Sequence, residues 1–191
     1  MDRNIILRDE RLRANFRLEF VREDMAEEIF AMVDGNREHL RPWFPWVDKT
    51  QTVADTLQFV ARMGEIWQRG EGGSFQIIAD GQMVGTAGIH QMQVQGDAQV
   101  GYWLAKEQTG RGYARAATVL LVNYFFEHTP QSVICICCAP DNVPSARVAQ
   151  ALGFSHIERR VGCHSDQLRE VDVYALTRSE WQKSAIFGAR V

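Results

Sequence analysis

The chain lacks long apolar runs and charge blocks, and these absences limit the classes of protein it can belong to. No stretch approaches the ~20 consecutive apolar residues of a membrane span. Residues 1–13 carry charges where a secretory signal has its apolar centre. No block of five like charges occurs and the net charge is only −3, so a nucleic-acid-binding surface is not expected. We therefore expect a cytoplasmic protein with neither a membrane nor a nucleic acid as partner.

Cysteine is scarce and poorly placed for a disulfide framework. Three of the four cysteines, Cys135, Cys137 and Cys138, crowd into one apolar run typical of a buried strand. Neighbouring strand residues point to opposite faces, and the run offers no second cysteine pair or nearby histidines for a metal. We expect reduced core cysteines and no metal site.

Internal repeats, low-complexity tracts and Pro/Gly/Ser-rich linkers are also absent. The 191 residues are 46% hydrophobic and 24% charged, which is typical of a globular protein and not of a disordered one. The length fits one hydrophobic core. The sequence thus predicts a single domain over residues 1–191.

Hydrophobic periodicity predicts a sheet flanked by helices. Alternating or continuous apolar segments predict strands at residues 16–20, 74–79, 83–90, 98–104, 133–138, 155–163 and 168–176. Apolar residues at helical spacing predict helices near residues 24–33, 53–67, 113–124, 145–152 and 179–185. Asp80 and Gly81 favour a type I′ hairpin, and Asp24 with Glu27 resembles a capping box. The predicted class is α/β with a mixed sheet.

A glycine-rich turn at residues 108–114 joins a predicted strand to a predicted helix. Gly110 and Gly112 let the backbone approach a ligand, the first N–H groups of the helix face the same point, and Arg111 adds a positive charge. The spacing fits neither Walker A nor the Rossmann G-x-G-x-x-G pattern. Taken alone, the turn is compatible with phosphate binding and with ordinary turn chemistry.

This turn is one of four motifs that follow each other in a fixed order. They are Gly101-Tyr-Trp-Leu104, Gly110-Arg-Gly-Tyr-Ala114, Asn142-x-x-Ser145 and Leu152-Gly-Phe154. Together they resemble the GNAT superfamily of N-acetyltransferases. Nearly the whole chain also resembles its ribosomal-protein-acetyltransferase-like (RimJ/RimL-type) branch, through Glu10-Arg-Leu12, Asn36-x-x-x-Leu40-x-x-Trp43, Trp46, Val84-Gly85, Asp172-x-Tyr174 and Glu180-Trp181.

The resemblance implies the GNAT fold, a single mixed and mostly antiparallel sheet of about six or seven strands flanked by helices, with a splayed central strand pair. It implies acetyl-CoA as co-substrate, no metal, and CoA contacts from Trp103, Leu104, Thr109, Gly110, Arg111, Gly112, Tyr113, Ala114, Asn142 and Ser145. The family usually has Arg or Gln where this chain has Thr109. Because the loop grips mainly through backbone N–H groups, we expect CoA binding to persist, with Thr109 donating through its backbone and its hydroxyl.

The resemblance also implies direct acetyl transfer to an amine, with two proton transfers to be catalysed. Ser145 matches the position near the CoA sulfur and is the candidate acid for the thiolate; the alternative is that it only caps a helix. His90, His164 and Glu38 are candidate bases, against the alternatives of a structural or surface role and of proton removal by water. Asn142 is expected to hydrogen-bond the cofactor arm.

Three aromatic residues, Trp43, Phe44 and Trp46, occupy the loop that in this branch forms a wall of the acceptor site. They contact the acceptor or pack the loop onto the next helix. The predicted function is acetyl transfer from acetyl-CoA to a primary amine, first of all the N-terminus of a ribosomal protein or another peptide. The alternatives are a small-molecule amine as acceptor and a non-catalytic acyl-CoA-binding sensor. A homodimer is common in this branch, but no motif here requires one.

Overall fold

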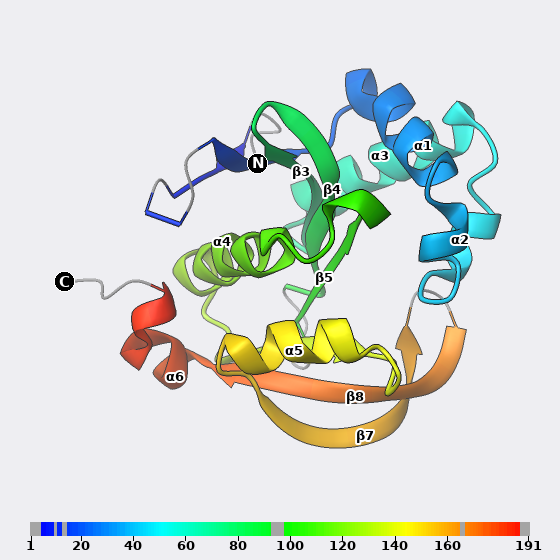
Figure 1. Ribbon diagram of the computed structural model, residues 1–191. Coiled ribbons are helices and arrows are strands. Elements are labelled where there is room, and N and C mark those ends of the chain that lie inside the picture. Colours follow the sequence, from blue (N-terminus) through cyan, green and yellow to red (C-terminus); the bar gives the residue numbers. More distant parts are fainter. Residues whose placement is uncertain (1–4, 10, 13–14, 93–97, 165–166, 188–191) are drawn as a thin grey trace.

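The computed structural model describes residues 5–9, 11–12, 15–92, 98–164 and 167–187, and these residues form an eight-stranded sheet (Figure 1). The strands are β1 (Ile6–Leu7), β2 (Phe16–Phe20), β3 (Gly72–Ala79), β4 (Gln82–His90), β5 (Gln99–Leu104), β6 (Val133–Cys138), β7 (Ser155–His164) and β8 (Gln167–Thr177). Their order in the sheet is β1-β2-β3-β4-β5-β6-β8-β7. Only the β5–β6 pair among these is parallel, so the sheet is mixed and mostly antiparallel, as expected.

Helices cover the sheet and also connect its strands. They are α1 (Ala26–Asp34), α2 (Arg37–Leu40), α3 (Val53–Gln68), α4 (Tyr113–His128), α5 (Val143–Ala151) and α6 (Arg178–Lys183), with 3-10 turns η1 (Glu23–Met25), η2 (Pro45–Asp48), η3 (Lys106–Gln108) and η4 (Ala185–Phe187). Helix α1 packs on α3, α4 packs on β4 and β5, and α5 packs on β6, β7 and β8 (Figure 1). The β5–α4–β6 crossover therefore lies at the centre of the fold.

An aromatic cluster fastens α3 and α4 to the sheet. Trp67, near the end of α3, lies with its ring centroid 5.1 Å from that of Phe20 on β2 and 5.8 Å from that of Phe75 on β3. It also stacks on Tyr124 of α4 at 5.6 Å. Burial of such rings is among the largest single contributions to a core. The cluster therefore holds the two longest helices in place around the central strands.

The two central strands β5 and β6 separate almost as soon as they meet. Gln99 and Cys135 form their one paired position, beside a 2.7 Å hydrogen bond from the Cys135 amide to the Ala98 carbonyl. On its other edge β5 stays paired with β4, where a Cβ on Gly85 would lie 2.1 Å from the Trp103 carbonyl oxygen. Only glycine allows this close approach. The expected splayed pair is confirmed, and a gap opens toward the carboxyl ends of β5 and β6.

Local signals predicted most elements, but one helix start was wrong. Helix α1 begins at Ala26 after a 3-10 turn, and no side chain caps it; Asp24 instead forms an ion pair with Arg22 at 3.2 Å. A true capping box joins Thr52 and Asp55 at the start of α3. The predicted I′ hairpin is confirmed, because Asp80 and Gly81 both have positive φ (51° and 81°). Strand β1 and helix α2, both very short, were not predicted.

The cysteines of β6 follow the sequence prediction with one exception. Cys135 and Cys138 are buried and all three are reduced. Cys137 is only half-buried and faces a cavity, because β5 has moved away from β6 at this level of the sheet. The prediction that all three are core cysteines is therefore wrong for Cys137.

Within the described ranges, no helix is both long enough and apolar enough to cross a membrane. The cytoplasmic location and the single domain over residues 1–191 stay predictions.

A buried carboxylate ties the last two strands together. Asp172 of β8 accepts two hydrogen bonds from the Arg159 guanidinium of β7, at 2.7 and 2.9 Å, and lies 3.2 Å from the His156 imidazole. The side chain of Asp172 is only 11% exposed. The hydrogen bonds from Arg159, and then that from His156, hold the pKa of Asp172 below its ordinary value, although burial opposes the shift. This group contributes to the stability of the β7–β8 pair as an anion.

We predict that Asp172→Asn lowers the free energy of unfolding at neutral pH, since the bidentate pair with Arg159 is lost. A carboxyl whose folded-state pKa is depressed stabilises the fold above its unfolded-state pKa, about 4, and loses this contribution as pH falls through the lower folded-state value. The difference between variant and wild type should therefore shrink below about pH 4. Urea unfolding over a pH series measures it.

Asp48→Asn is the matched control for this experiment. Asp48 forms an ion pair with Arg41 at 2.8 Å, but both side chains are more than half exposed. Exposed pairs contribute little to stability. Equal losses of stability in the two variants would contradict the structural role given to Asp172.

Candidate active site

A cavity of about 460 Å³ occupies the gap between β5 and β6. Its walls come from α2 and the loop after it, from β5, from the glycine turn and first turn of α4, from the end of β6 and from the start of α5. The lining residues are His39, Leu40, Trp43, Phe44, Val100, Gly101, Tyr102, Trp103, Leu104, Thr109, Gly110, Gly112, Tyr113, Ala114, Arg115, Ile136, Cys137, Cys138, Asn142, Pro144, Ser145, Arg147 and Val148. Elements far apart in the sequence therefore share one opening.

The glycine turn forms one end of this cavity. Gly110 and Gly112 have φ of 74° and 81°, a conformation that suits glycine, and a Cβ at either position would meet no atom within 4 Å. Gly112 is the N-cap of α4 and provides no side-chain cap for the first N–H groups of the helix. Such N–H groups, with the positive end of the helix dipole, bind anions. The turn therefore has open space beside both glycines.

Two arginines line the cavity, and neither of them is Arg111, the arginine that the sequence predicted. Arg115, in the first turn of α4, and Arg147 of α5 both border the cavity. Arg111 is exposed and is not among the lining residues. Thr109 lines the cavity, but its amide and its hydroxyl both donate to the Lys106 carbonyl, at 3.2 and 2.8 Å. The expectation that Thr109 offers these two donors to a phosphate is therefore wrong for this conformation.

Asn142, and not Ser145, is the capping residue at the start of α5. The Asn142 side-chain oxygen accepts a hydrogen bond from the Ser145 amide at 3.2 Å, so Asn142 is the N-cap. Ser145 is the third residue of the helix, and the alternative that it serves as the cap is wrong. Its hydroxyl lies 3.0 Å from the hydroxyl of Tyr102 on β5, so a hydrogen bond crosses the cavity from one wall to the other.

The environment keeps the acidic groups around Ser145 protonated. Burial raises the pKa of Tyr102 to about 12, although its hydrogen bond with Ser145 acts in the opposite direction. Burial likewise raises the pKa of the Cys138 thiol. Near neutral pH, Tyr102 is thus a hydrogen-bond donor, and Cys138 is a neutral thiol rather than a nucleophilic thiolate.

Another wall of the cavity is aromatic. His39 and Leu40 of α2 line it together with Trp43 and Phe44 of the following loop. Trp46 does not line the cavity; its ring lies 5.6 Å from Phe44 and 6.3 Å from Trp103, so it packs the loop onto β5.

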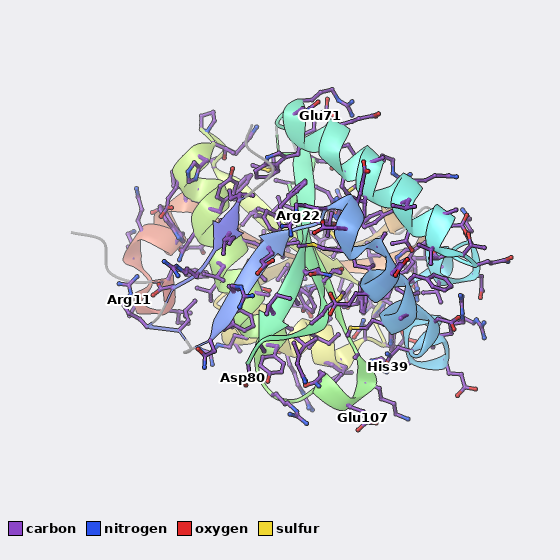
Figure 2. All side chains as sticks on the ribbon, turned by 90° about the horizontal axis from the view of Figure 1, so that it is seen from above. Arg11, Arg22, His39, Glu71, Asp80 and Glu107 are labelled. Carbon is purple, nitrogen blue, oxygen red and sulfur yellow. The ribbon has the colours of Figure 1, made fainter. Side chains whose placement is uncertain are left out.

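Asn36 connects this wall to the end where the glycine turn lies. Its side-chain oxygen accepts from the Lys106 amide at 2.8 Å, and its side-chain nitrogen donates to the Met32 carbonyl at 2.8 Å. The turn between α1 and α2 is therefore held against the connection that follows β5. In Figure 2, His39 on α2 and Glu107 on η3 lie at the same end of the molecule.

Two of the three bases predicted from the sequence, Glu38 and His90, are not among the described residues that line the cavity. Glu38 is exposed and is not a lining residue, although the next residue, His39, is one. His90, at the end of β4, is also exposed and outside the lining. The backbone of His164 ends β7, but its side chain is outside the described part of the structure.

Sequence reasoning missed His39, Arg115, Arg147 and Cys137 as cavity residues, and it left Tyr102 open between a core and a cofactor-lining role. His39 stands inside the motif Asn36-x-x-x-Leu40-x-x-Trp43, and its place beside these residues was a usable signal. Arg115 follows the glycine turn within one helical turn and was also within reach. Tyr102 and Cys137 required knowledge of where β5 and β6 separate.

Within the described part of the chain, no group of three or more His, Cys, Asp or Glu is arranged to hold a metal ion.

Known proteins share this sequence pattern and fold. The sequence model of the acetyltransferase (GNAT) domain family matches residues 15–155. The ribosomal-protein-serine acetyltransferase of Escherichia coli is 25% identical over 138 residues, covering 72% of this chain and 77% of that protein.

Two solved structures have the same fold. RimL, a ribosomal L7/L12 alpha-N-protein acetyltransferase in complex with coenzyme A, superposes with a TM-score of 0.82 at 19% identity, over 92% of this chain and 99% of that one. The microcin C7 self-immunity acetyltransferase MccE, in complex with acetyl-CoA and AMP, superposes with a TM-score of 0.79 at 17% identity, over 87% and 94% of the two chains. Since the family match spans most of the chain and includes the glycine turn, both central strands and the start of α5, this protein belongs to the GNAT acetyltransferases and moves the acetyl group of acetyl-CoA to an amine.

Proposed function

We propose that this N-acetyltransferase acts on the N-terminal amine of a peptide, with the N-terminus of a ribosomal protein as first candidate. The observation that carries the proposal is the aromatic wall of Trp43 and Phe44, which borders the same cavity as the glycine turn. The names of the relatives support the acceptor class, since the Escherichia coli relative acts on a serine of a ribosomal protein and RimL on the L7/L12 N-terminus.

The residues around the cavity fit acetyl-CoA in charge and shape. The open turn at Gly110 and Gly112 and the guanidinium groups of Arg115 and Arg147 suit phosphates. The gap beside Trp103 and Leu104 suits the extended arm, since no strand among the described residues pairs with that edge of β5 beyond Gln99. Acetyl-CoA supplies the activated acyl group. The chain has to orient it, keep out water and move two protons.

We assign to Ser145 the donation of a proton to the departing CoA thiolate. Its hydroxyl is held by Tyr102 at 3.0 Å. Tyr102, with a pKa of about 12, stays protonated near neutral pH and can donate to the Ser145 oxygen while Ser145 gives up its own proton. Because the Asn142 side chain caps α5, the Ser145 hydroxyl is not needed to cap that helix.

We assign to His39 the removal of a proton from the acceptor amine. Among the described lining residues, it is the one imidazole, and a neutral imidazole can accept a proton from an amine. It lies in the aromatic wall next to Leu40 rather than at the phosphate end. It replaces Glu38, His90 and His164 as the proposed base, and rate–pH profiles of wild type and His39→Asn test the assignment.

Acceptor choice is tested by a thiol-release assay with acetyl-CoA and a panel of amines. We expect N-terminal peptides of ribosomal proteins to give a higher kcat/KM than polyamines, amino acids and aminoacyl nucleotides, with one acetyl group added at the peptide N-terminus by mass spectrometry. The same peptides with a blocked N-terminus are the control and should give no release. A clear preference for the nucleotide-linked amines would favour a small-molecule acceptor, as the AMP-bound neighbour suggests.

Gly112→Trp should abolish acetyl-CoA binding in a calorimetric titration, because its side chain projects into the open space at the phosphate end. Gly81→Trp is the matched control. Gly81 has the same φ of 81° and equally open surroundings, but it lies in the β3–β4 hairpin away from the cavity. The backbone cost is therefore the same in both variants. If both bind acetyl-CoA as the wild type does, the assignment of the turn to the phosphates is wrong.

Ser145→Ala should lower kcat by about tenfold to a hundredfold, at or below the low end of general acid effects because a thiolate is a stable leaving group. The KM for acetyl-CoA and the thermal unfolding midpoint should change little, since Asn142 keeps its hydrogen bond to the residue 145 amide. Ser145→Thr retains a hydroxyl and should recover part of the rate. An unchanged kcat in Ser145→Ala would mean that water, and not Ser145, protonates the CoA thiolate.

A further inference from the structure

Arg169, near the start of β8, reaches two segments that carry walls of the cavity. Its guanidinium donates a hydrogen bond to the Pro42 carbonyl at 3.4 Å, across 127 positions of the chain, and lies 4.0 Å from the Asp141 carboxylate. In Figure 1 the start of β8 lies on the same side of the molecule as α2 and the start of α5. The side chain of Arg169 therefore connects three separate parts of the fold.

Each contact of Arg169 lies one residue before a residue that lines the cavity. Pro42 directly precedes Trp43 of the aromatic wall. Asp141 directly precedes Asn142, which lines the cavity at the start of α5. Arg169 itself is not among the lining residues. Its guanidinium thus lies at the rim of the cavity, between the aromatic wall and α5.

Arg169 is held more loosely than two arginines that fasten parts of the fold together. Arg159 makes two hydrogen bonds to Asp172, at 2.7 and 2.9 Å, and Arg37 donates to two carbonyls, both at 2.6 Å. Arg169 has one long hydrogen bond and one ion pair at 4.0 Å, and its side chain is 28% exposed. A guanidinium has five N–H donors. Most donors of Arg169 therefore have no acceptor among the described residues, and a ligand can use them.

The chemistry of the rim fits a neutral carbonyl oxygen. The acceptor amine has to pass the rim to reach the cavity, so a peptide brings the carbonyl nearest to its N-terminal amine close to this position. Arg169 and Asp141 together carry no net charge, which favours a neutral acceptor group over a carboxylate. A hydrogen bond from a guanidinium to a carbonyl is charge-assisted and stronger than one between neutral groups. A simple amine offers no such oxygen.

We propose that Arg169 is a specificity-determining residue that donates a hydrogen bond to the first main-chain carbonyl of a peptide acceptor. The inference rests on the proposed peptide acceptor and adds the group that distinguishes a peptide from a simple amine. Arg169 moves no proton in the reaction. Its loss should therefore raise the KM for the acceptor more than it lowers kcat.

Two analogues of a short peptide amide that begins with serine test this contact in the thiol-release assay. One has a ketomethylene group and the other an (E)-alkene in place of the first peptide bond, so both lack its N–H and only the ketone keeps the carbonyl. In the wild type the alkene should have a kcat/KM at least about tenfold lower than the ketone, mainly through KM, since a hydrogen bond from a charged donor is lost. In Arg169→Ala the two analogues should differ by less than about twofold.

Arg69→Ala is the matched control. Arg69 forms an ion pair with Glu71 at 3.0 Å, and both side chains are about half-exposed. In Figure 2, Glu71 lies at the opposite end of the molecule from His39, which lines the cavity. This variant should keep the full preference for the ketone. Calorimetric binding of acetyl-CoA and the thermal unfolding midpoint show that both variants are folded.

Two results would overturn the role of Arg169 alone. They are equal kcat/KM values for the two analogues in the wild type, and an unchanged preference for the ketone in Arg169→Ala. Either result would leave Arg169 with only its structural contact to Pro42. A wild type that releases CoA with small amines but not with the parent peptide would instead count against the peptide acceptor, and would overturn this inference with it.

Discussion

Strands β5 and β6 are adjacent and parallel, yet they hold each other through one paired position and then diverge. Backbone groups that leave a ladder need other partners, so a gap of this kind is stable only when other walls close around it and a ligand or water fills it. Helices α4 and α5 begin at this gap, and their N-terminal turns face it. The cavity, the place of the glycine turn beside it and the position of Ser145 all follow from this separation.

The aromatic wall of the cavity depends on hydrogen bonds from two side chains in the α1–α2 region. Asn36 joins Met32 to the Lys106 amide, seventy positions along the chain. Arg37 donates to the carbonyls of Val47 and Thr50, both at 2.6 Å, and so holds the loop that carries the aromatic wall. A loop fixed at both ends presents its aromatic side chains with little loss of entropy on binding. The wall is thus a built part of the site.

Sequence reasoning succeeded where a local signal decides the structure. The hairpin at Asp80 and Gly81 and the glycine turn at Gly110 and Gly112 have the backbone conformations that their residue types favour. It failed where distant contacts decide: Asp24 pairs with Arg22 rather than capping a helix, and Cys137 is uncovered by the divergence of another strand.

For the site, the motifs led to the glycine turn and to Ser145, whereas the bases could not be chosen from the sequence. A histidine or glutamate gains its role from what surrounds it. Residues adjacent in sequence can have different surroundings, as the exposed Glu38 and the cavity-lining His39 do.

Thr109 lines the cavity, but its hydrogen-bond donors are already used within the chain. The amide and hydroxyl of Thr109 close the turn after η3, so the open shape of the glycine turn relies on the φ angles of Gly110 and Gly112 and not on the side chain at position 109. A site formed by backbone N–H groups tolerates such a substitution. A wall formed by side chains changes the specificity with each substitution in it. This is why the co-substrate follows from the fold and the acceptor has to be measured.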